Sequence, residues 1–472
     1  MSTNNDEADI ARLPAYRQRD LIGKGELSAR ELLEVCWKRL EQVNPRINAV
    51  VTISETAEEE AKALDERQAR GEEPGLLHGL VVGIKDVTPV QGLRTTYGCT
   101  VYADNIAQED ALVVRRLREA GAVILGKTNT PEFAAGGNTF NPVFGRTRNP
   151  WNLERSAGGS TGGGAAALAA GIISMAEGTD LGGSLRIPAA FCGVAGLRPS
   201  PGLVPTVPSE YLWDSLQVSG GLGRTFPDIA LFLQAVAGPS DECPIYQPTR
   251  GRDFLQGCLS ELPKGMKVAY CADISGYGVD SEVEQACREA AFELRQAGVE
   301  VEEVELDFSF ARQAFLALRG YWMVSHHLRH LGILGQFGDN LRSNIEAGLK
   351  VSSEELAAAE RARGHLWRLM RDVLQNYDHL LTPTLAVPPF PVEQNYPETI
   401  GGEKMGTYID WLASTFLLSL TSLPVASVPV GPDASGFPAG LQVAGRPLGE
   451  EQVLSTARHL QDLAGLGLPP LD

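Results

Sequence analysis

The chain has 472 residues, of which 43% are hydrophobic and 21% charged, a composition typical of globular proteins that bury a core. Its formal net charge of −18 disfavours direct binding to nucleic acid phosphates or to an anionic membrane surface. Seven scattered cysteines without a C-x-x-C pair argue against a disulfide framework and a zinc site. The acidic, polar start MSTNNDEADI lacks the regions of a secretory signal, and no segment is apolar enough to span a bilayer, so we expect a cytoplasmic protein.

The N-terminal part predicts helices and then a βα alternation. Ser28 and Glu31 match a capping box, and apolar residues follow at helical spacing. The predicted elements are a helix after Ser28, a helix over 55–70, a strand over 80–84 (LVVGI), a helix over 110–120 and a strand over 121–125 (GAVIL). This alternation favours an α/β protein with a large, mixed, mostly parallel sheet covered by helices on both faces.

The C-terminal part predicts further strands and helices. Residues 204–265 are rich in Pro and Gly and show no clear periodicity. The predicted elements beyond them are strands over 267–271, 299–306, 379–385, 423–430 and 440–445, a helix capped by Ser281 and Glu284 that ends before Gly298, a mostly helical stretch over 308–374, and a helix from about 450. Because no break in composition divides the chain, we expect a single domain over residues 1–472.

The most informative stretch spans residues 156–199 and holds two serines, Ser160 and Ser184, each behind a Gly-Gly pair. An Ala-rich helix and a short apolar strand are predicted between them. Near Ser184, the N–H groups of Leu181, Gly182, Gly183 and Ser184 itself could converge on one small space, as an oxyanion hole requires. The alternative is a Gly-rich turn with an ordinary capping serine.

A serine nucleophile needs a base, and Lys85 is one candidate. It ends the apolar run over 80–84, where burial would disfavour its charged form, and Ser-Lys pairs are a known variant of the serine-nucleophile design. The alternative is a structural lysine paired with Asp86. None of the seven histidines lies in a motif typical of Ser-His-Asp enzymes. His326 and His330 have a possible metal-ligand spacing, but no third ligand is evident.

The run GGSTGGGAAALAAG…GTDLGGSLRIPAAFCGVAGLRP resembles the amidase signature sequence. The resemblance extends upstream through GLVVGIKDV and GKTNTPEFAAGGNTFNPVFGRTRNPW, and downstream through LLTPTLAVPP, LPVASVPVG and GFPAGLQVAGRP, so it covers most of residues 77–446. It implies the amidase signature fold, no metal and no cofactor. It also implies an amidohydrolase that cleaves linear amides through a serine acyl-enzyme.

The resemblance also implies roles for individual residues. It implies a Ser-Ser-Lys triad, with Ser184 as nucleophile, Ser160 as the bridging serine after a cis peptide bond, and Lys85 as base. The remaining implied positions are Leu181, Gly182, Gly183 and Ser184 as the oxyanion hole, Thr161, Asp180 and Arg186 as supporting polar groups, and Gly136, Gly137 and Asn138 on the acyl side of the pocket. The family commonly has a second serine where Thr161 stands, so a hydroxyl is kept there.

Within the single domain we expect a helical segment over 1–75 packed on the core, a catalytic core motif over 77–205 and a variable pocket region over about 305–420. In that region Tyr321, Trp322 and Trp411 suggest room for an apolar or aromatic acyl group, or they belong to the core. We expect a small-molecule amide substrate, no nucleic acid partner and no membrane partner, and the sequence leaves a homodimer open.

Three other functions compete with a stand-alone amidase. The A subunit of the tRNA-dependent amidotransferase, a glutaminase, typically carries Gln where Ile187 stands, and it has a Tyr-Gly-Arg-Val run that is missing after Pro199. A nucleotide-binding module would use Gly162, Gly164 and Ala167 as a G-x-G-x-x-A motif, but no predicted strand precedes it. A catalytically silent binding protein is disfavoured because all three triad positions are present.

Overall fold

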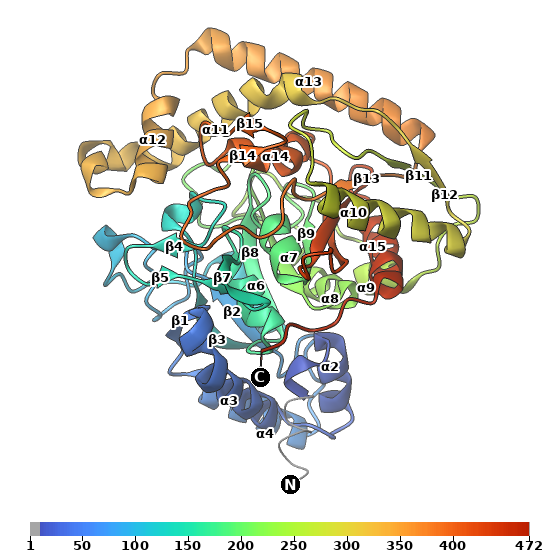
Figure 1. Ribbon diagram of the computed structural model, residues 1–472. Coiled ribbons are helices and arrows are strands. Elements are labelled where there is room, and N and C mark those ends of the chain that lie inside the picture. Colours follow the sequence, from blue (N-terminus) through green and yellow to red (C-terminus); the bar gives the residue numbers. More distant parts are fainter. Residues whose placement is uncertain (1–9, 472) are drawn as a thin grey trace.

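The computed structural model describes residues 10–471 and is built around one 11-stranded sheet (Figure 1). The strand order is β1-β3-β2-β8-β10-β9-β16-β17-β13-β11-β12. The strands are β1 Val50–Ile53, β2 Val81–Lys85, β3 Val123–Thr128, β8 Met175–Asp180, β9 Ala195–Arg198, β10 Val218–Gly223, β11 Lys267–Tyr270, β12 Glu300–Glu303, β13 His379–Pro383, β16 Val425–Val430 and β17 Ala439–Ala444. Residues 1–9, on which the expectation of no secretory signal depends, lie outside the described residues.

The sheet is mixed, as predicted, and its parallel ladders fall into two groups. The strands β3, β2 and β8 run parallel on one side, and β13, β11 and β12 run parallel on the other. The other six ladders are antiparallel, so the parallel character expected for most of the sheet is confined to these two groups. The connections between strands explain this pattern. Helices link β2 to β3 and β11 to β12, which allows parallel pairing, whereas a short loop joins β16 to β17 and makes that pair antiparallel.

Helices cover both faces of the sheet, as predicted. The helices are α2 Ala15–Gly23, α3 Ala29–Ile47, α4 Ala57–Ala69, α5 Leu112–Glu119, α6 Gly162–Ala169, α7 Arg186–Cys192, α8 Phe226–Val236, α9 Phe254–Leu259, α10 Ser281–Glu293, α11 Arg312–His327, α12 Asp339–Gly348, α13 Ser353–Asn376, α14 Ala413–Leu420 and α15 Glu450–Ala464. In β10, Gly220 faces Leu185 beside α7, whereas Gly221 faces Phe232 of α8. Because successive strand residues point to opposite faces, α7 and α8 lie on opposite sides of the sheet.

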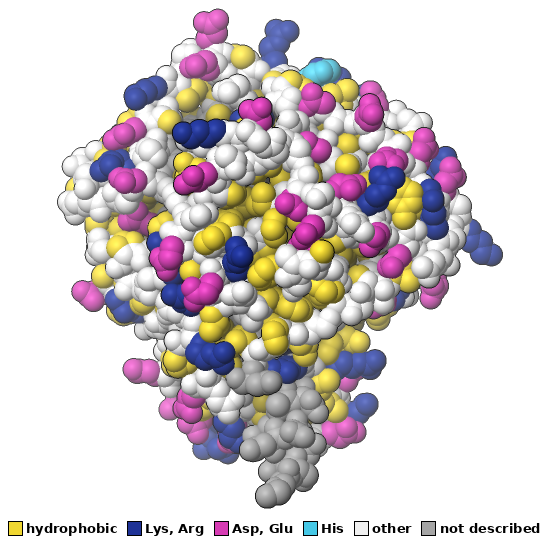
Figure 2. All heavy atoms as spheres, in the orientation of Figure 1, with side chains coloured by type: hydrophobic (Ala, Val, Ile, Leu, Met, Phe, Trp, Pro, Cys, Tyr) yellow, Lys and Arg dark blue, Asp and Glu magenta, His cyan; other side chains and the backbone are white. Residues whose placement is uncertain are grey.

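Short strands and 3-10 turns complete the described chain. The hairpins pair β4 Phe140–Asn141 with β5 Gly145–Arg146, β6 Arg148–Asn149 with β7 Asn152–Ser156, and β14 Thr399–Ile400 with β15 Glu403–Lys404. The 3-10 turns are η1 Thr100–Tyr102, η2 Glu132–Ala134, η3 Leu294–Ala297, η4 Ser309–Ala311, η5 Leu328–Gln336 and η6 Asp410–Leu412. Figure 2 shows acidic and basic side chains interspersed over one face, with hydrophobic side chains gathered near its middle. Within residues 10–471, no helix is both long and apolar enough to cross a membrane.

Most predicted elements are present, and two differences have physical causes. The capping box of Ser28 and Glu31 begins α3 as predicted. The cap of α10 is instead Asp280, whose carboxylate accepts from the Glu282 amide, so the predicted cap at Ser281 is wrong by one residue. The stretch without periodicity contains β10, α8 and α9. Strand β10 reads VSGGLG and has Val218 as its one β-branched apolar residue among three glycines, which gives little indication of a strand.

A layer of helices lies over the sheet edge at which β8 ends. In Figure 1 this layer comprises α11, α12 and α13 in yellow and orange, with α14 beneath them. Two hydrogen bonds tie α14 to the segment after β8: Thr415 Oγ1 donates to the Gly182 carbonyl in the turn at 2.7 Å, and Arg186 Nη2 at the start of α7 donates to Ser419 Oγ at 2.7 Å. The region over about 305–420 therefore covers the residues that follow β8.

Candidate active site

Lys85 lies at the end of β2 with its side chain wholly buried. Its Nζ lies 2.7 Å from Ser160 Oγ, 3.1 Å from Thr161 Oγ1 and 3.1 Å from Thr179 Oγ1. Strands β2 and β8 are adjacent and parallel, so they bring Lys85 and Thr179 to the same sheet edge. Three hydroxyl groups therefore surround the lysine nitrogen.

The alternative pairing of Lys85 with Asp86 is wrong. The Asp86 carboxylate lies 3.7 Å from Lys127 Nζ and accepts from the Thr96 hydroxyl. Among the described residues, no carboxylate lies within 4.0 Å of the Lys85 nitrogen. Asp86 is thus engaged by Lys127 and Thr96 and does not pair with Lys85.

Burial controls the protonation of Lys85. It lowers the pKa of Lys85 to about 7, against smaller opposing effects of Glu177 and Asp180. Burial also raises the pKa of Glu177, whose carboxylate accepts from the Lys85 backbone amide at 3.1 Å and from Thr88 Oγ1 at 3.0 Å. A substantial fraction of Lys85 is therefore neutral near pH 7.

Ser160 lies in a glycine-rich turn that leads into α6. The Gly159–Ser160 peptide bond is cis, as the sequence resemblance implied. A Cβ atom on Gly159 would lie 2.9 Å from the Gly136 carbonyl oxygen and 3.1 Å from the Asn138 nitrogen. Only glycine fits at position 159, because the backbone of residues 136–138 packs directly against it.

Ser184 lies in the turn between β8 and α7, which Asp180 fixes. The Asp180 carboxylate accepts from the Gly183 amide at 2.8 Å and from the Leu185 amide at 3.2 Å. Gly183 has φ +121°, and a Cβ there would lie 2.4 Å from Thr415 Oγ1. The Gly183 N–H is thus engaged by Asp180. Among the described residues, the structure gives no acceptor for the amides of Leu181, Gly182 and Ser184, so these three remain as the predicted oxyanion donors.

Asp180 is held by two buried arginines. Burial alone would raise the pKa of Asp180, yet the guanidinium groups of Arg186 and Arg198 hold it well below its usual range. Arg186 donates to both carboxylate oxygens at 3.0 Å, and Arg198 donates to one at 3.2 Å. Arg186 also donates to Gln442 Oε1 at 2.7 Å. The network anchors the turn that carries Ser184 to the sheet.

Ser160 and Ser184 line one inner cavity of about 30 Å³. Its lining is mostly apolar and comes from the core motif and from the helical layer: Phe133, Ala134, Gly136, Ser160, Thr179, Leu181, Gly182, Ser184, Ile187, Gln217, Phe315, Arg319, Trp322, Met323, Tyr408, Ile409 and Leu412. Of the three residues predicted on the acyl side, Gly136 lines this cavity. Gly137 packs on Trp411 instead, and the Asn138 side-chain amide donates to the Val392 and Gln394 carbonyls.

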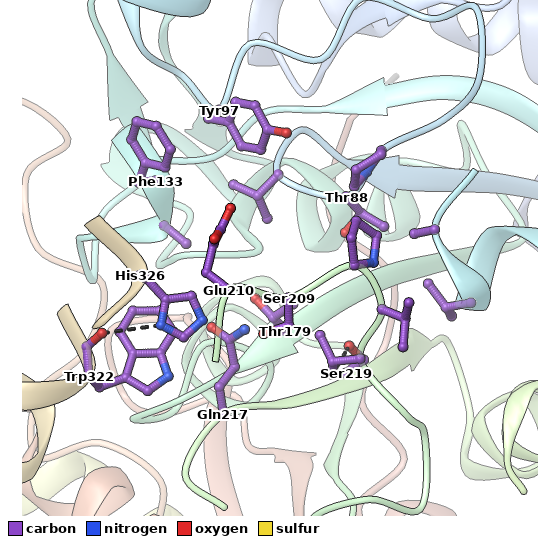
Figure 3. Close-up of a pocket in the computed structure, with 18 of the residues that line it drawn as sticks. Thr88, Tyr97, Phe133, Thr179, Ser209, Glu210, Gln217, Ser219, Trp322 and His326 are labelled. Carbon is purple, nitrogen blue, oxygen red and sulfur yellow. Dashed lines mark hydrogen bonds between the residues drawn. The ribbon is translucent and has the colours of Figure 1, made fainter. Parts of the chain in front are cut away.

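An outer cavity of about 310 Å³ adjoins the inner one (Figure 3). The two share Phe133, Ala134, Thr179, Gln217 and Trp322 in their linings. Figure 3 shows aromatic side chains on two sides of the outer cavity, with Tyr97 and Phe133 on one and Trp322 and His326 on the other. Its lining includes exposed residues such as Glu210, whereas no residue of the inner lining is exposed. The inner cavity therefore lies behind the outer one.

Two pattern-based alternatives do not match this geometry. Gly162, Gly164 and Ala167 are buried in α6, and a Cβ on the neighbouring Gly163 would lie 2.3 Å from a backbone nitrogen, which leaves no room for a nucleotide phosphate. His330 Nε2 lies 2.6 Å from the Tyr102 hydroxyl rather than beside His326. Within residues 10–471, no group of three or more His, Cys, Asp or Glu side chains is placed to hold a metal ion.

The structure adds residues that sequence reasoning missed or left undecided. Thr179 and Gln217 lie at the boundary of the two cavities, and Arg319 and Tyr408 line the inner one. Thr179 could have been noticed because it directly precedes Asp180. Of the aromatic candidates, Trp322 lines both cavities, whereas Trp411 belongs to the core and Tyr321 is exposed.

Comparisons with known proteins agree with this site. The family model described as Amidase matches residues 31–454. An acylamidase from Rhodococcus erythropolis is 35% identical over 463 residues, covering 96% of each chain. The A subunit of the glutamyl-tRNA(Gln) amidotransferase from Moorella thermoacetica is 35% identical over 477 residues, covering 95% of this chain and 96% of that one. The crystal structure of a bacterial aryl acylamidase superposes with a TM-score of 0.87 at 30% identity, covering 97% of this chain and 99% of that one. This chain belongs to the amidase signature family of amidohydrolases.

Proposed function

We propose that this amidase hydrolyses the C–N bond of linear carboxamides through an acyl-enzyme on Ser184, with Ser160 as proton relay and Lys85 as base. The observation that carries the proposal is the 2.7 Å contact between Lys85 Nζ and Ser160 Oγ at a fully buried position. A neutral amine has two N–H donors and one lone pair. It can donate to Thr161 and Thr179 while accepting the Ser160 proton.

In the acylation step, Lys85 takes a proton from Ser160 as Ser160 takes one from Ser184. The Ser184 oxygen attacks the amide carbonyl carbon, and the carbonyl oxygen becomes negatively charged. The amides of Leu181, Gly182 and Ser184 are the donors available to stabilise it. Gly183 supports the step indirectly, because its N–H holds the turn against Asp180.

The tetrahedral intermediate then expels the amine. An amide anion is a very poor leaving group, so the departing nitrogen must receive a proton as the C–N bond breaks. Ser160 donates that proton and regains one from protonated Lys85. A water molecule repeats the relay on the acyl-enzyme, releases the carboxylic acid and restores Ser184 and neutral Lys85.

The two cavities assign the two halves of the substrate. The amine leaves first while the acyl group stays bonded to Ser184, so the amine must lie on the side that opens outward. The acyl group therefore occupies the inner cavity, whose size restricts it to a few atoms, and the amine occupies the outer cavity with its aromatic walls. This arrangement suits a short acyl group on an aromatic amine, and relatives named acylamidase and aryl acylamidase support it.

We further propose that the chain works as a single-domain, stand-alone enzyme of the cytoplasm. One sheet contains strands from Val50–Ile53 to Ala439–Ala444. Ile187, where the A subunit of the amidotransferase typically has Gln, contributes an apolar wall to the inner cavity. All seven cysteines are free thiols, which fits a reducing compartment. Purification without a partner protein, with hydrolytic activity retained, tests the stand-alone proposal.

The proposal is tested by trapping the intermediate. The enzyme is mixed with 4-nitroacetanilide and quenched in acid, and its intact mass and peptide map are measured. We expect one acetyl group on the peptide that contains Ser184, and no adduct in Ser184→Ala. Acetylation of a different residue, or full turnover by Ser184→Ala, would falsify the assignment.

A further inference from the structure

We propose that Arg319 and Tyr408 form a recognition site for a carboxylate on the acyl group of the substrate. The proposal rests on the function proposed above, because it assigns the acyl half to the inner cavity. It narrows the substrate class to amides whose short acyl group ends in an anionic oxygen group. Neither residue belongs to the core motif, so they determine specificity rather than the bond-breaking chemistry.

Arg319 is a buried cation without a counter-ion. Its side chain extends from α11 into the lining of the inner cavity and is 8% exposed. Its Nε donates to Asn344 Oδ1 at 3.1 Å and its Nη2 to the Tyr408 hydroxyl at 2.6 Å, and both partners are neutral. Among the described residues, no carboxylate lies within 4.0 Å of this guanidinium, and Nη1 has no acceptor. A buried charge in this situation is costly unless something else neutralises it.

Tyr408, which lines the same cavity, adds a second unused donor. Its hydroxyl oxygen accepts from Arg319 at 2.6 Å and from Asn344 Nδ2 at 3.1 Å, so its own O–H remains to be donated. For that proton, the structure gives no acceptor among residues 10–471. The side chain is buried and lines the inner cavity. Arg319 Nη1 and the Tyr408 hydroxyl therefore offer donors, and no acceptor, to a ligand.

This donor set selects the ligand chemistry. Positive charge and unused donors favour a carboxylate, since hydrogen bonds between charged partners are about twice as strong as neutral ones. Apolar walls such as Phe315 and Met323 exclude water and strengthen the interaction. The inner cavity is small, about 30 Å³, so the spacer between the scissile carbonyl and the carboxylate must be short. Malonyl and succinyl amides fit this description.

The experiment compares acyl groups of equal shape on one leaving group. The substrates are the 4-nitroanilides of malonic monoacid and of 3-methylbutyric acid, which differ in having a carboxylate or an isopropyl group at the same place. We expect wild-type kcat/KM to favour the malonyl substrate by roughly 10- to 100-fold. Tyr408→Phe removes one donor without changing shape and should reduce this ratio by roughly threefold to tenfold. Arg319→Met should abolish the preference, chiefly through KM for the malonyl substrate.

A binding measurement separates this inference from the catalytic proposal. Malonate is titrated into Ser184→Ala by calorimetry, with 3-methylbutyrate as the matched control. We expect malonate to bind to Ser184→Ala, and binding to be lost in the Ser184→Ala, Arg319→Met double variant. If the enzyme hydrolyses neither anilide, nor any other amide, the catalytic proposal fails while malonate binding still decides this one. Equal hydrolysis of the two anilides, or malonate binding that survives loss of Arg319, overturns the inference.

Discussion

Two buried lysines lie on neighbouring strands, and their surroundings differ in one respect. Lys85 ends β2 and Lys127 lies in the adjacent β3, each wholly buried. Burial lowers the pKa of Lys85 to about 7 and that of Lys127 to about 8. Lys127 has the Asp86 carboxylate at 3.7 Å and also donates to Thr95 Oγ1 at 2.9 Å. Lys85 has three hydroxyl groups and, among the described residues, no carboxylate within 4.0 Å.

The difference shows that burial alone does not make a lysine a base. A nearby carboxylate stabilises the charged form of Lys127, and the pair then serves to hold β3 against the residues that follow β2. Hydroxyl groups stabilise the charged form of Lys85 far less and can pass protons. The environment of Lys85 therefore suits proton transfer, and that of Lys127 suits structure.

The largest expected effect is on turnover. Lys85→Met should lower kcat by roughly 10³- to 10⁵-fold, because relay members act as a unit. The matched control, Lys127→Met, should keep kcat of the folded enzyme within about tenfold, since Lys127 contacts neither catalytic serine. Rates with 4-nitroacetanilide, normalised to the folded fraction, check both values. Equal losses in the two variants would contradict the distinction between the lysines.

The second expected effect is a loss of stability when Lys127 is replaced. Lys127→Met leaves the Asp86 carboxylate buried without its counter-ion, which should lower the free energy of unfolding by about 3–5 kcal/mol. The double variant Lys127→Met, Asp86→Asn should recover part of that loss. Urea unfolding followed by circular dichroism measures all three proteins. A Lys127→Met protein as stable as wild type would show that the pair has no structural role.

The third effect is the pH dependence of stability. Between pH 7 and pH 10.5, Lys85 is mostly neutral in the folded protein but protonated in the unfolded chain. Because the unfolded chain holds the extra proton, raising the pH favours folding across this window, by at most about 1.4 kcal/mol per pH unit. Below pH 7 both states are protonated and the slope from Lys85 vanishes. Lys85→Met should flatten the rise in the free energy of unfolding between pH 7 and 8, where Lys127 contributes less to the slope. An unchanged slope in Lys85→Met would mean that Lys85 stays charged in the folded protein.

The smallest effect concerns the hydroxyl groups around Lys85. Thr161→Ser keeps the oxygen that lies 3.1 Å from Lys85 Nζ, so kcat should stay within about threefold. Gly178 and Gly164 make room for the threonine methyl, because a Cβ on them would lie 2.5 Å and 3.2 Å from it. Thr161→Val removes the oxygen and should cost at least about tenfold. If valine is tolerated as well as serine, this hydroxyl does not orient the lysine.

The sequence predicts the motif residues well because each lies in a distinctive local pattern. Lys85 follows an apolar strand, and Ser160 and Ser184 follow glycine pairs, so their chemistry can be read before their contacts are known. The parallel pairing of β2 with β8 then brings the separate segments together. The sequence does not say which amides of the turn are free, because Asp180 decides this by capturing the N–H of Gly183.

The substrate-facing wall is much harder to predict. Arg319 and Tyr408 lie on different segments of the helical layer and meet only through tertiary packing. In the sequence, Arg319 is one arginine in an amphipathic helix. Tyr408 is one aromatic residue shortly before Trp411. Periodicity reports which face of a helix is buried, and it carries no information about which buried polar group lacks a partner. That information requires the packed structure.

The proposed mechanism requires Lys85 to be a neutral base at the working pH of the enzyme. Its protonation can be followed by ¹³C NMR of protein labelled at the lysine Cε carbons, with the Lys85 signal assigned by its absence from Lys85→Met. We expect a titration midpoint near pH 7 for this signal, and a rise in kcat/KM over the same range. A midpoint near the ordinary lysine value of 10.5, with kcat/KM insensitive to pH near neutrality, would contradict the mechanism.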